Sequence, residues 1–327
     1  MDIIKQHKIF VVTPAGRKKY LEILSKYILK DDSIDEWHLW DNCRDESDRE
    51  YICQLSREHK KITVIKECGV DGTNKSVNKF YKYCRDEDVF YIKMDDDIVY
   101  LPEKFGLKLY LKAIREKNSF SWWSPMVINN AICTYLLKTK GRIKTNAFLS
   151  AQASCPVGWG SPFFAELLHR AFLKSIKMLE SDKWKLENDY EIFLQRFSIN
   201  TIGFFGDFSK SLGDRFCPLD VDDEEYISAT LPVLVGKPGR LVGDIVVAHF
   251  SFFTQEQYLL TTNILEEYAY VAGVHNYSQP GNRKKLKIFK HLKQLLKYNI
   301  KYILNDILGV YLQRKINTYR VSLNDER

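Results

Sequence analysis

The 327-residue chain lacks several features that would assign it to a specialised class of protein. Its seven cysteines are odd in number, scattered and without a CxxC pair, which argues against a disulfide framework or a zinc site and predicts reduced thiols. No apolar run reaches about 18 residues, so no membrane-spanning helix is expected. The N-terminal MDIIKQHKIF lacks the layout of a signal peptide, and glycine and proline are not enriched. We therefore expect a cytoplasmic globular protein, with disorder only near its ends.

Charge is present but unevenly distributed. Residues 283–327 contain 12 basic and 3 acidic side chains, whereas the rest of the chain contains 37 basic and 39 acidic ones. The net charge of +7 therefore belongs to the C-terminal tail, and the main body is nearly neutral. The length predicts one large α/β domain with an extension, or two domains.

The first half of the chain alternates two kinds of periodicity. Short apolar runs typical of strands occupy residues 8–14, 36–41, 61–67 and 89–95. Segments with helical spacing lie between them, at residues 17–29, 44–59 and 72–84. This alternation predicts right-handed βαβ units with parallel strands, and such sheets bind ligands beyond the carboxyl ends of their strands. The segment from Thr13 to Arg17, Asp41 and the aspartates after residue 94 are all expected at that edge.

The second half of the chain is less regular. Residues 119–129 predict a strand leading into a loop, and residues 151–164 predict an irregular surface loop. Residues 185–205 predict a loop, a short helix and a strand, and residues 241–253 predict a strand that ends near His249. We expect a catalytic domain over residues 1–280, with halves at 1–118 and 119–280, followed by a helical tail over 281–327.

Three adjacent aspartates, Asp95 to Asp97, follow the buried run FYIKM. A helix cap or a solvated turn is the simplest interpretation of any one of them. Three together favour a site for a divalent cation, because Mg²⁺ and similar ions prefer carboxylate oxygens. An EF-hand is excluded because the loop glycine and the terminal glutamate are missing. A P-loop is weakly matched by GVDGTNKS (69–76), where Asn74 replaces a glycine that would wrap the phosphates.

This series of elements resembles the nucleotide-binding half of the GT-A-fold glycosyltransferases over about residues 8–255. The resemblance implies a mixed α/β sheet flanked by helices, with a DxD motif at Asp95 and Asp97. It also implies nucleotide contacts in VVTPAGR, HLWDN, GTNKSVNK and the DDD run. The residues expected to bind the nucleotide or cofactor are Thr13, Pro14, Ala15, Arg17, Asp41, Asn74, Lys75, Asn78, Asp95 and Asp96.

Two later segments extend the resemblance. ENDYEIFLQRF (187–197) loosely matches the acidic pattern that carries the catalytic base of inverting members, with Asp189 in the acidic position. Asn188 stands where glutamate is usual, which leaves Glu187 and Glu191 as alternative bases. His249 in VVAHFSF matches a histidine that completes the metal shell with Asp95 and Asp97. The residues expected at the acceptor are Trp159, Gly160 and Glu187.

The implied reaction is sugar transfer from a nucleotide-diphosphate sugar, with a UDP-sugar favoured, assisted by Mn²⁺ or Mg²⁺. The acceptor would be a saccharide or a lipid-linked glycan in surface polysaccharide synthesis, and the outcome would be inversion. Retention is the first alternative. A sugar nucleotidyltransferase is the second, although PAGRKK is poor in glycine for that class. A non-enzymatic membrane adaptor is the third, and no nucleic-acid partner is expected.

The tail has the pattern of a basic amphipathic helix. Its apolar stripe contains Ile288, Phe289, Leu292, Leu295, Leu296, Ile300 and Ile303. Lysines 287, 290, 293, 297 and 301 gather on the other side. The stripe can pack on the protein itself, or it can lie in an anionic membrane surface with the lysines near headgroups. The second interpretation predicts a peripheral protein on the inner face of the cytoplasmic membrane.

Overall fold

The computed structural model describes residues 6–275, 277 and 322–323. The chain divides into two compact units. The first contains Met1–Met126 and Glu187–Val247, and the second contains Val127–Leu186 and Ala248–Arg327. Within the described residues, no helix combines the length and the apolar character needed to cross a bilayer.

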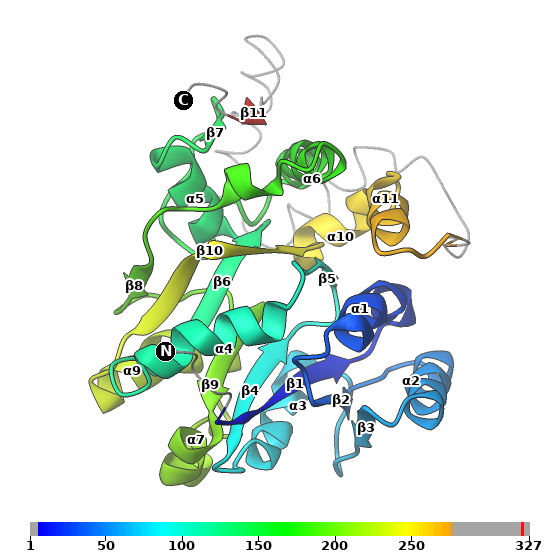
Figure 1. The fold of residues 1–327 in the computed structure, drawn as a ribbon, viewed down its shortest axis with the longest axis vertical. Coiled ribbons are helices and arrows are strands. Elements are labelled where there is room, and N and C mark those ends of the chain that lie inside the picture. The colour runs from blue at the N-terminus through cyan, green and yellow to red at the C-terminus, as the bar shows by residue number, and fades with distance from the viewer. Residues whose placement is uncertain (1–5, 276, 278–321, 324–327) are drawn as a thin grey trace. The chain divides into compact units, whose positions relative to one another are not determined.

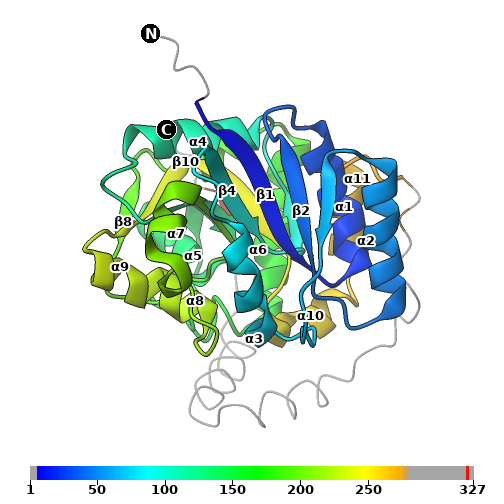
Figure 2. The same ribbon diagram turned by 90° about the horizontal axis from the view of Figure 1, so that it is seen from below.

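The first unit is built around a nine-stranded sheet with the order β3-β2-β1-β4-β9-β6-β10-β5, to which β8 is added beside β10. The strands are β1 (Lys8–Ala15), β2 (Glu36–Asp41), β3 (Ile62–Ile65), β4 (Val89–Met94), β5 (Ile98–Tyr100), β6 (Trp122–Ile128), β8 (Tyr190–Ile192), β9 (Thr201–Phe205) and β10 (Gly239–His249). Strands β3, β2, β1 and β4 are parallel, whereas β9 is antiparallel to β4 and β6. Figure 2 shows β4, β1 and β2 side by side. The predicted α/β mixed sheet is therefore confirmed.

Helices flank this sheet (Figure 1). They are α1 (Lys18–Lys30), α2 (Glu46–Glu58), α3 (Asn74–Val77), α4 (Phe105–Arg115), α7 (Gly206–Leu212), α8 (Asp223–Glu225) and α9 (Leu231–Val235). The shorter helical turns are η1 (Asn78–Tyr83), η3 (Gly213–Arg215) and η4 (Tyr226–Thr230). Helix α2 packs on β2 and β3, α4 on β1 and β9, and α7 on β4 and β9.

The pattern of apolar residues explains the central elements. All six residues of β4 are buried, as expected for a strand covered on both faces. Helix α1 buries Tyr20, Ile23, Leu24 and Ile28, which recur at helical spacing. The expected strands and helices of residues 8–95 are therefore present, although the helix expected over 72–84 divides into α3 and the 3₁₀ turn η1.

The helix predicted within residues 185–205 is wrong. Tyr190–Ile192 forms the strand β8, which pairs antiparallel with Gly239–Leu241 of β10. The sequence of this short segment does not distinguish a helix from a strand, and its pairing with β10 made it a strand. The strand expected at the end of this segment is present as β9.

The second unit contains mainly helices. They are α5 (Ala131–Thr139), α6 (Pro162–Lys177), α10 (Phe253–Leu259) and α11 (Ile264–Val271), with the turn η2 (Ser181–Trp184) and the short pair β7 (Ile143–Lys144) and β11 (Ser322–Leu323). Helix α6 contacts α10 and α11. Residues 151–161 form turns, as predicted, and Ser161 caps α6 by accepting a hydrogen bond from the N–H of Phe164.

The tail predicted over residues 281–327 lies outside the described residues, apart from Ser322–Leu323. Its helical form and its contact with a membrane therefore stay predictions. The domain boundaries expected at residues 118 and 280 stay predictions as well.

Candidate functional site

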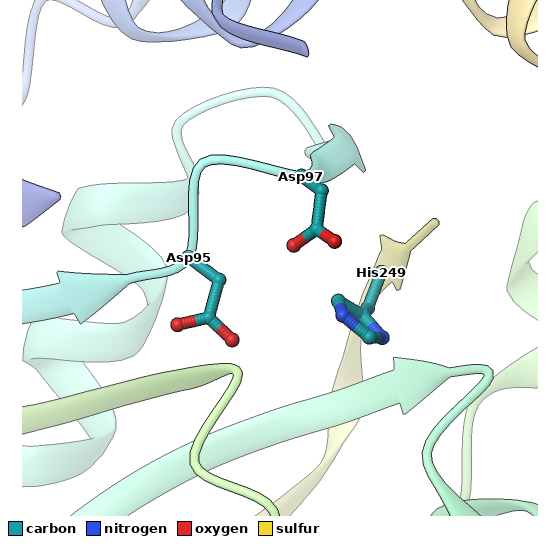
Figure 3. Close-up of side chains that lie close together, drawn as sticks. All are labelled: Asp95, Asp97 and His249. Atoms are coloured by element: carbon teal, nitrogen blue, oxygen red, sulfur yellow. The ribbon is translucent and has the colours of Figure 1, made fainter. Parts of the chain in front are cut away.

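Two strand ends of the sheet bring together two carboxylates and one imidazole. Asp95 and Asp97 follow β4, and His249 is the last residue of β10. One ligand atom from each of the three lies within 4.8 Å of the others. Figure 3 shows both carboxylates and the imidazole directed toward a common space. Both β4 and β10 are hydrogen-bonded into the same sheet, so the sheet itself locates this group.

Asp95 is held by a buried lysine and an asparagine. The Nζ of Lys93 lies 2.5 Å from Oδ1 of Asp95 and also donates to the carbonyl of Ile199 at 3.1 Å. Asn200 donates from Nδ2 to Oδ2 of Asp95 at 3.2 Å and accepts a bond from the N–H of Asp95. Burial lowers the pKa of Lys93, whereas the charges of Asp95, Asp223 and Glu224 raise it. The carboxylates outweigh burial, so the net shift of the pKa is upward. Lys93 is therefore a buried cation.

The middle aspartate, Asp96, binds the loop that follows β1. Asp96 accepts hydrogen bonds from the N–H of Gly16 at 3.1 Å and from Nε of Arg17 at 3.0 Å. A second nitrogen of Arg17 contacts both Asp96 and Asp97, the latter at 3.1 Å. Burial raises the pKa of Asp96, and Arg17 opposes this shift. Asp96 thus fixes the loop after β1 onto the loop after β4.

The chemistry of this group suits a hard divalent cation. Arg17 is paired with Asp96 and Asp97, and Lys93 is paired with Asp95. A carboxylate has about four lone-pair sites, so Asp95 and Asp97 can accept their hydrogen bonds and still bind a metal. Carboxylate oxygens are the donors that Mn²⁺ and Mg²⁺ prefer, and the imidazole of His249 adds a nitrogen donor of the kind that transition metals bind.

The residues expected around a nucleotide lie at the same edge, in differing environments. Thr13 is fully buried, and its hydroxyl accepts a hydrogen bond from Trp37 Nε1 at 3.0 Å. Pro14 and Ala15 end β1 opposite Trp40 and Asp41. Asp41 is bound by Arg49 at 3.1 Å and by the N–H of Cys43.

The polar segment before β4 has two parts. Asn74 and Lys75 are exposed in the first turn of α3. Asn78 is buried and donates from Nδ2 to the carbonyls of Pro218 and Val221 at 2.7 and 2.9 Å. Asn78 therefore anchors the segment that leads into α8, a function that the sequence pattern did not indicate.

Asp189 is not brought to the Asp95–Asp97–His249 group. Its Oδ1 accepts a hydrogen bond from the N–H of Gly243 at 2.8 Å, and Lys112 and Arg240 lie 3.7 and 3.9 Å from its Oδ2. Gly243 precedes His249 by six residues in β10, which corresponds to about 20 Å along a strand. The structure gives Asp189 the task of fixing β8 against β10.

Another carboxylate, Asp223, lies near Asp95. It starts α8, and its Oδ2 accepts a hydrogen bond from the hydroxyl of Tyr81 at 3.1 Å. Burial raises the pKa of Asp223, the charge of Lys93 lowers it, and the charge of Asp95 raises it again. The acidic run DVDDEEY contains the only sequence signal for this residue, and such a run usually indicates a solvated surface.

The residues expected at the acceptor lie in two different segments of the chain. Glu187 is exposed, next to Asp189 in the chain. Trp159 is half-buried, and its ring packs 5.2 Å from Phe253 and 6.1 Å from Phe252. The ring of Phe252 lies 4.8 Å from that of His249. A Cβ on Gly160 would lie 2.6 Å from the carbonyl oxygen of Pro156, so this tight turn requires glycine.

Sequence reasoning overlooked Lys93, although its signal was present. A lysine in the middle of an apolar strand that is buried on both faces must have a partner, because an unpaired buried charge is costly. The partner, Asp95, is two residues away. Asn200 had no such signal, because its contact depends on the pairing of β4 with β9.

No protein-family model matches the sequence, and no curated protein matches it. Several solved structures are similar in fold. A mannosyltransferase from Pyrobaculum calidifontis, in complex with GDP-Man and Mn²⁺, is 12% identical over 96% of this chain and 83% of its own, with a TM-score of 0.48. TarS 1-349 from S. aureus is 16% identical over 92% of this chain and 72% of its own, with a TM-score of 0.44. A 4-diphosphocytidyl-2C-methyl-D-erythritol synthase from Anaerococcus prevotii is 11% identical over 82% of this chain and 96% of its own, with a TM-score of 0.39. These likenesses concern the fold alone.

Proposed function

We propose that this protein is a metal-dependent glycosyltransferase that uses a nucleotide-diphosphate sugar, with UDP as the favoured nucleotide. The observation that carries the proposal is the convergence of Asp95, Asp97 and His249 at one edge of an α/β sheet. That edge also holds the ends of β1 and β2, where the carboxyl ends of parallel strands form ligand sites.

The proposed roles follow from the contacts. Asp95, Asp97 and His249 hold Mn²⁺ or Mg²⁺, which when bound would neutralise charge on the departing diphosphate. Arg17 contacts Asp97 and Lys93 contacts Asp95, so the two cations hold these carboxylates in place. Asp41 at the end of β2, with Asn74 and Lys75 in the first turn of α3, is proposed to contact the nucleoside and its phosphates.

Deprotonation of the acceptor hydroxyl needs a carboxylate close to the reacting centre. Asp223 meets this condition better than Asp189, because the charge of Asp95 raises the pKa of the Asp223 carboxyl, whereas Asp189 accepts a hydrogen bond from the N–H of Gly243 in β10. We therefore assign Asp223 as the base of an inverting reaction. A product that keeps the donor's anomeric configuration would instead indicate retention and remove the need for this base.

The acceptor is proposed to be a saccharide or a lipid-linked glycan. The half-buried ring of Trp159, joined through Phe252 to His249, offers an apolar surface of the kind that packs on sugar rings.

The proposal is tested by thermal unfolding with UDP, GDP, CDP and ATP, each with and without Mn²⁺. We expect one nucleoside diphosphate, UDP first, to stabilise the protein only when Mn²⁺ is present. A ligand at 100 times its Kd stabilises by about 2.7 kcal/mol. If no nucleotide has a metal-dependent effect, the proposal is wrong. Release of pyrophosphate from a nucleoside triphosphate and a sugar phosphate would favour a nucleotidyltransferase instead.

The basic tail motivates a further part of the proposal, a peripheral position on an anionic membrane surface. Each lysine near such a surface contributes about 1 kcal/mol, and salt screens the effect. Full-length protein should sediment with vesicles containing an anionic lipid and be released at high salt. Equal binding to neutral vesicles, or none to anionic ones at low salt, would contradict this position.

A further inference from the structure

A buried polar network in the second unit surrounds the residue that follows His249. The carbonyl oxygen of Phe250 accepts two hydrogen bonds, from Nδ2 of Asn129 at 3.0 Å and from Nε2 of His169 at 2.8 Å. Asn129 and His169 are 1% and 0% exposed. Two donors on one buried carbonyl fix the main chain immediately after the proposed metal ligand.

His169 is held in one protonation state. Its Nε2 must carry the proton to donate to a carbonyl, so its Nδ1 accepts from the hydroxyl of Tyr268 at 2.9 Å. Burial lowers the pKa of His169 to about 4. The imidazole is thus a neutral structural donor at pH 7.

Gln255 connects this network to the turn that carries Trp159. Its Oε1 accepts from Nδ2 of Asn129 at 2.8 Å and from the N–H of Phe252 at 3.2 Å. Its Nε2 donates to the carbonyl of Trp159 at 2.9 Å, and Thr254 donates to the same carbonyl at 3.0 Å. Gln255 is fully buried, so each end of its amide has a defined partner.

The backbone of Asn129 suits this task. Its φ of 65° lies in the left-handed region, which asparagine tolerates better than most residues. The position therefore combines a backbone conformation open to asparagine or glycine with a side chain that only asparagine provides. Glycine in its place would keep the backbone and delete the donor.

We propose that Asn129, His169 and Gln255 are positioning residues that hold His249 in the geometry required for binding a divalent cation. The inference rests on the proposed metal site. Partners hydrogen-bonded directly to a metal ligand typically change metal affinity by about 10–100-fold when mutated. Asn129, His169 and Gln255 act instead through the main chain that follows His249, so we expect an effect at the lower end of that range. The same network makes the His249 segment and the Trp159 turn one connected structure.

The test compares the affinity for Mn²⁺ alone with the thermal stability of each variant. Asn129→Gly and Gln255→Met are expected to weaken Mn²⁺ binding by about 10-fold, the lower end of the range for direct partners of a metal ligand. Ser175→Ala is the matched control, because it removes a buried hydrogen bond of the same unit, from Trp184 Nε1 at 2.8 Å, that has no link to His249. The control should lose stability to a similar degree and keep its Mn²⁺ affinity.

A conservative pair of variants provides a second measurement. His169→Gln keeps an N–H donor and should retain more Mn²⁺ affinity than His169→Phe. Folded Asn129→Gly and His169→Phe proteins with wild-type Mn²⁺ affinity would overturn the inference while leaving the metal site intact. A wild-type chain that does not bind Mn²⁺ would overturn the proposed function, and this inference with it.

Discussion

The two strand ends that form the candidate site are stabilised by different physical means. At the end of β4, charged groups hold one another, with Arg17 on Asp96 and Asp97 and Lys93 on Asp95. At the end of β10, neutral buried groups hold the chain, with Asn129, His169 and Gln255 around Phe250 and Phe252.

The difference assigns separate tasks to the two sides. The aspartate side brings the carboxylates of Asp95 and Asp97 close together, so a bound cation should stabilise it. On the histidine side, the neutral side chains of Asn129, His169 and Gln255 hold the main chain after His249 by hydrogen bonds. Metal and nucleotide should therefore act mainly on the first side, and substitutions in the second should act through ligand geometry.

The largest expected effect is that of Asp97→Ala. Loss of this carboxylate should abolish Mn²⁺-dependent nucleotide binding and sugar transfer, while Asp96 still holds Arg17 and the fold persists. Calorimetric titration with UDP and Mn²⁺ measures the binding. Asp214→Ala, which changes a carboxylate that is 95% exposed, should behave like wild type. Near-normal turnover of Asp97→Ala in EDTA would show that no metal acts in the reaction.

The next largest effect separates the two candidate bases. Asp223→Asn should lower turnover by about 10²–10⁴-fold, because a general base supplies that much, and should leave donor affinity nearly unchanged. Asp189→Asn should retain most of the turnover and lose some stability, because its carboxylate binds Gly243 in β10. Initial rates and donor Kd for the two variants decide the matter. The reverse ranking would return the role to Asp189.

The Lys93→Met variant tests how much the buried pair of Lys93 and Asp95 contributes to the stability of the protein without substrate. Removing one member of a buried ion pair costs about 3 kcal/mol, since the remaining charge loses its partner. The side chain of Lys93 is 5% exposed and that of Asp95 is 27% exposed, so we expect a loss near or below this value in urea unfolding.

Added Mn²⁺ should restore more stability to the Lys93→Met variant than it adds to wild type. Arg85→Met is the control, because the partner of Arg85 is Asp214 on the surface, and exposed pairs contribute less than about 1 kcal/mol. Equal losses in the two variants would mean that Lys93 is not a structural counter-ion.

The smallest expected effect is a loss of stability at acid pH that comes from the buried, neutral His169. The folded pKa of His169 is lowered from 6.5 to about 4, so the unfolded chain binds more protons between these values. The stability from neutral His169 is complete above pH 6.5 and falls as the pH drops toward 4, by up to about 3 kcal/mol. His169→Gln should show a shallower loss over this window in unfolding measured at successive pH values. An unchanged slope would contradict the neutral state of His169.

The sequence by itself determined the alternation of strands and helices over residues 8–95 and the position of the aspartates after a buried strand. Both depend on local patterns, since apolar periodicity and burial act within about ten residues. It also indicated that a histidine would end the late strand. For the tail the sequence remains the sole source, because residues 278–321 lie outside the described part of the chain.

Only the tertiary structure decided which polar groups meet. Arg17 and Asp96 are 79 residues apart, and Asn129 and Gln255 are 126 apart, so no local pattern could reveal either pair. Likewise, Asp189 binds the N–H of Gly243 because Tyr190–Ile192 paired with β10 instead of forming a helix. A buried polar group must find a partner wherever the fold offers one, and that choice is made by long-range packing rather than by sequence spacing.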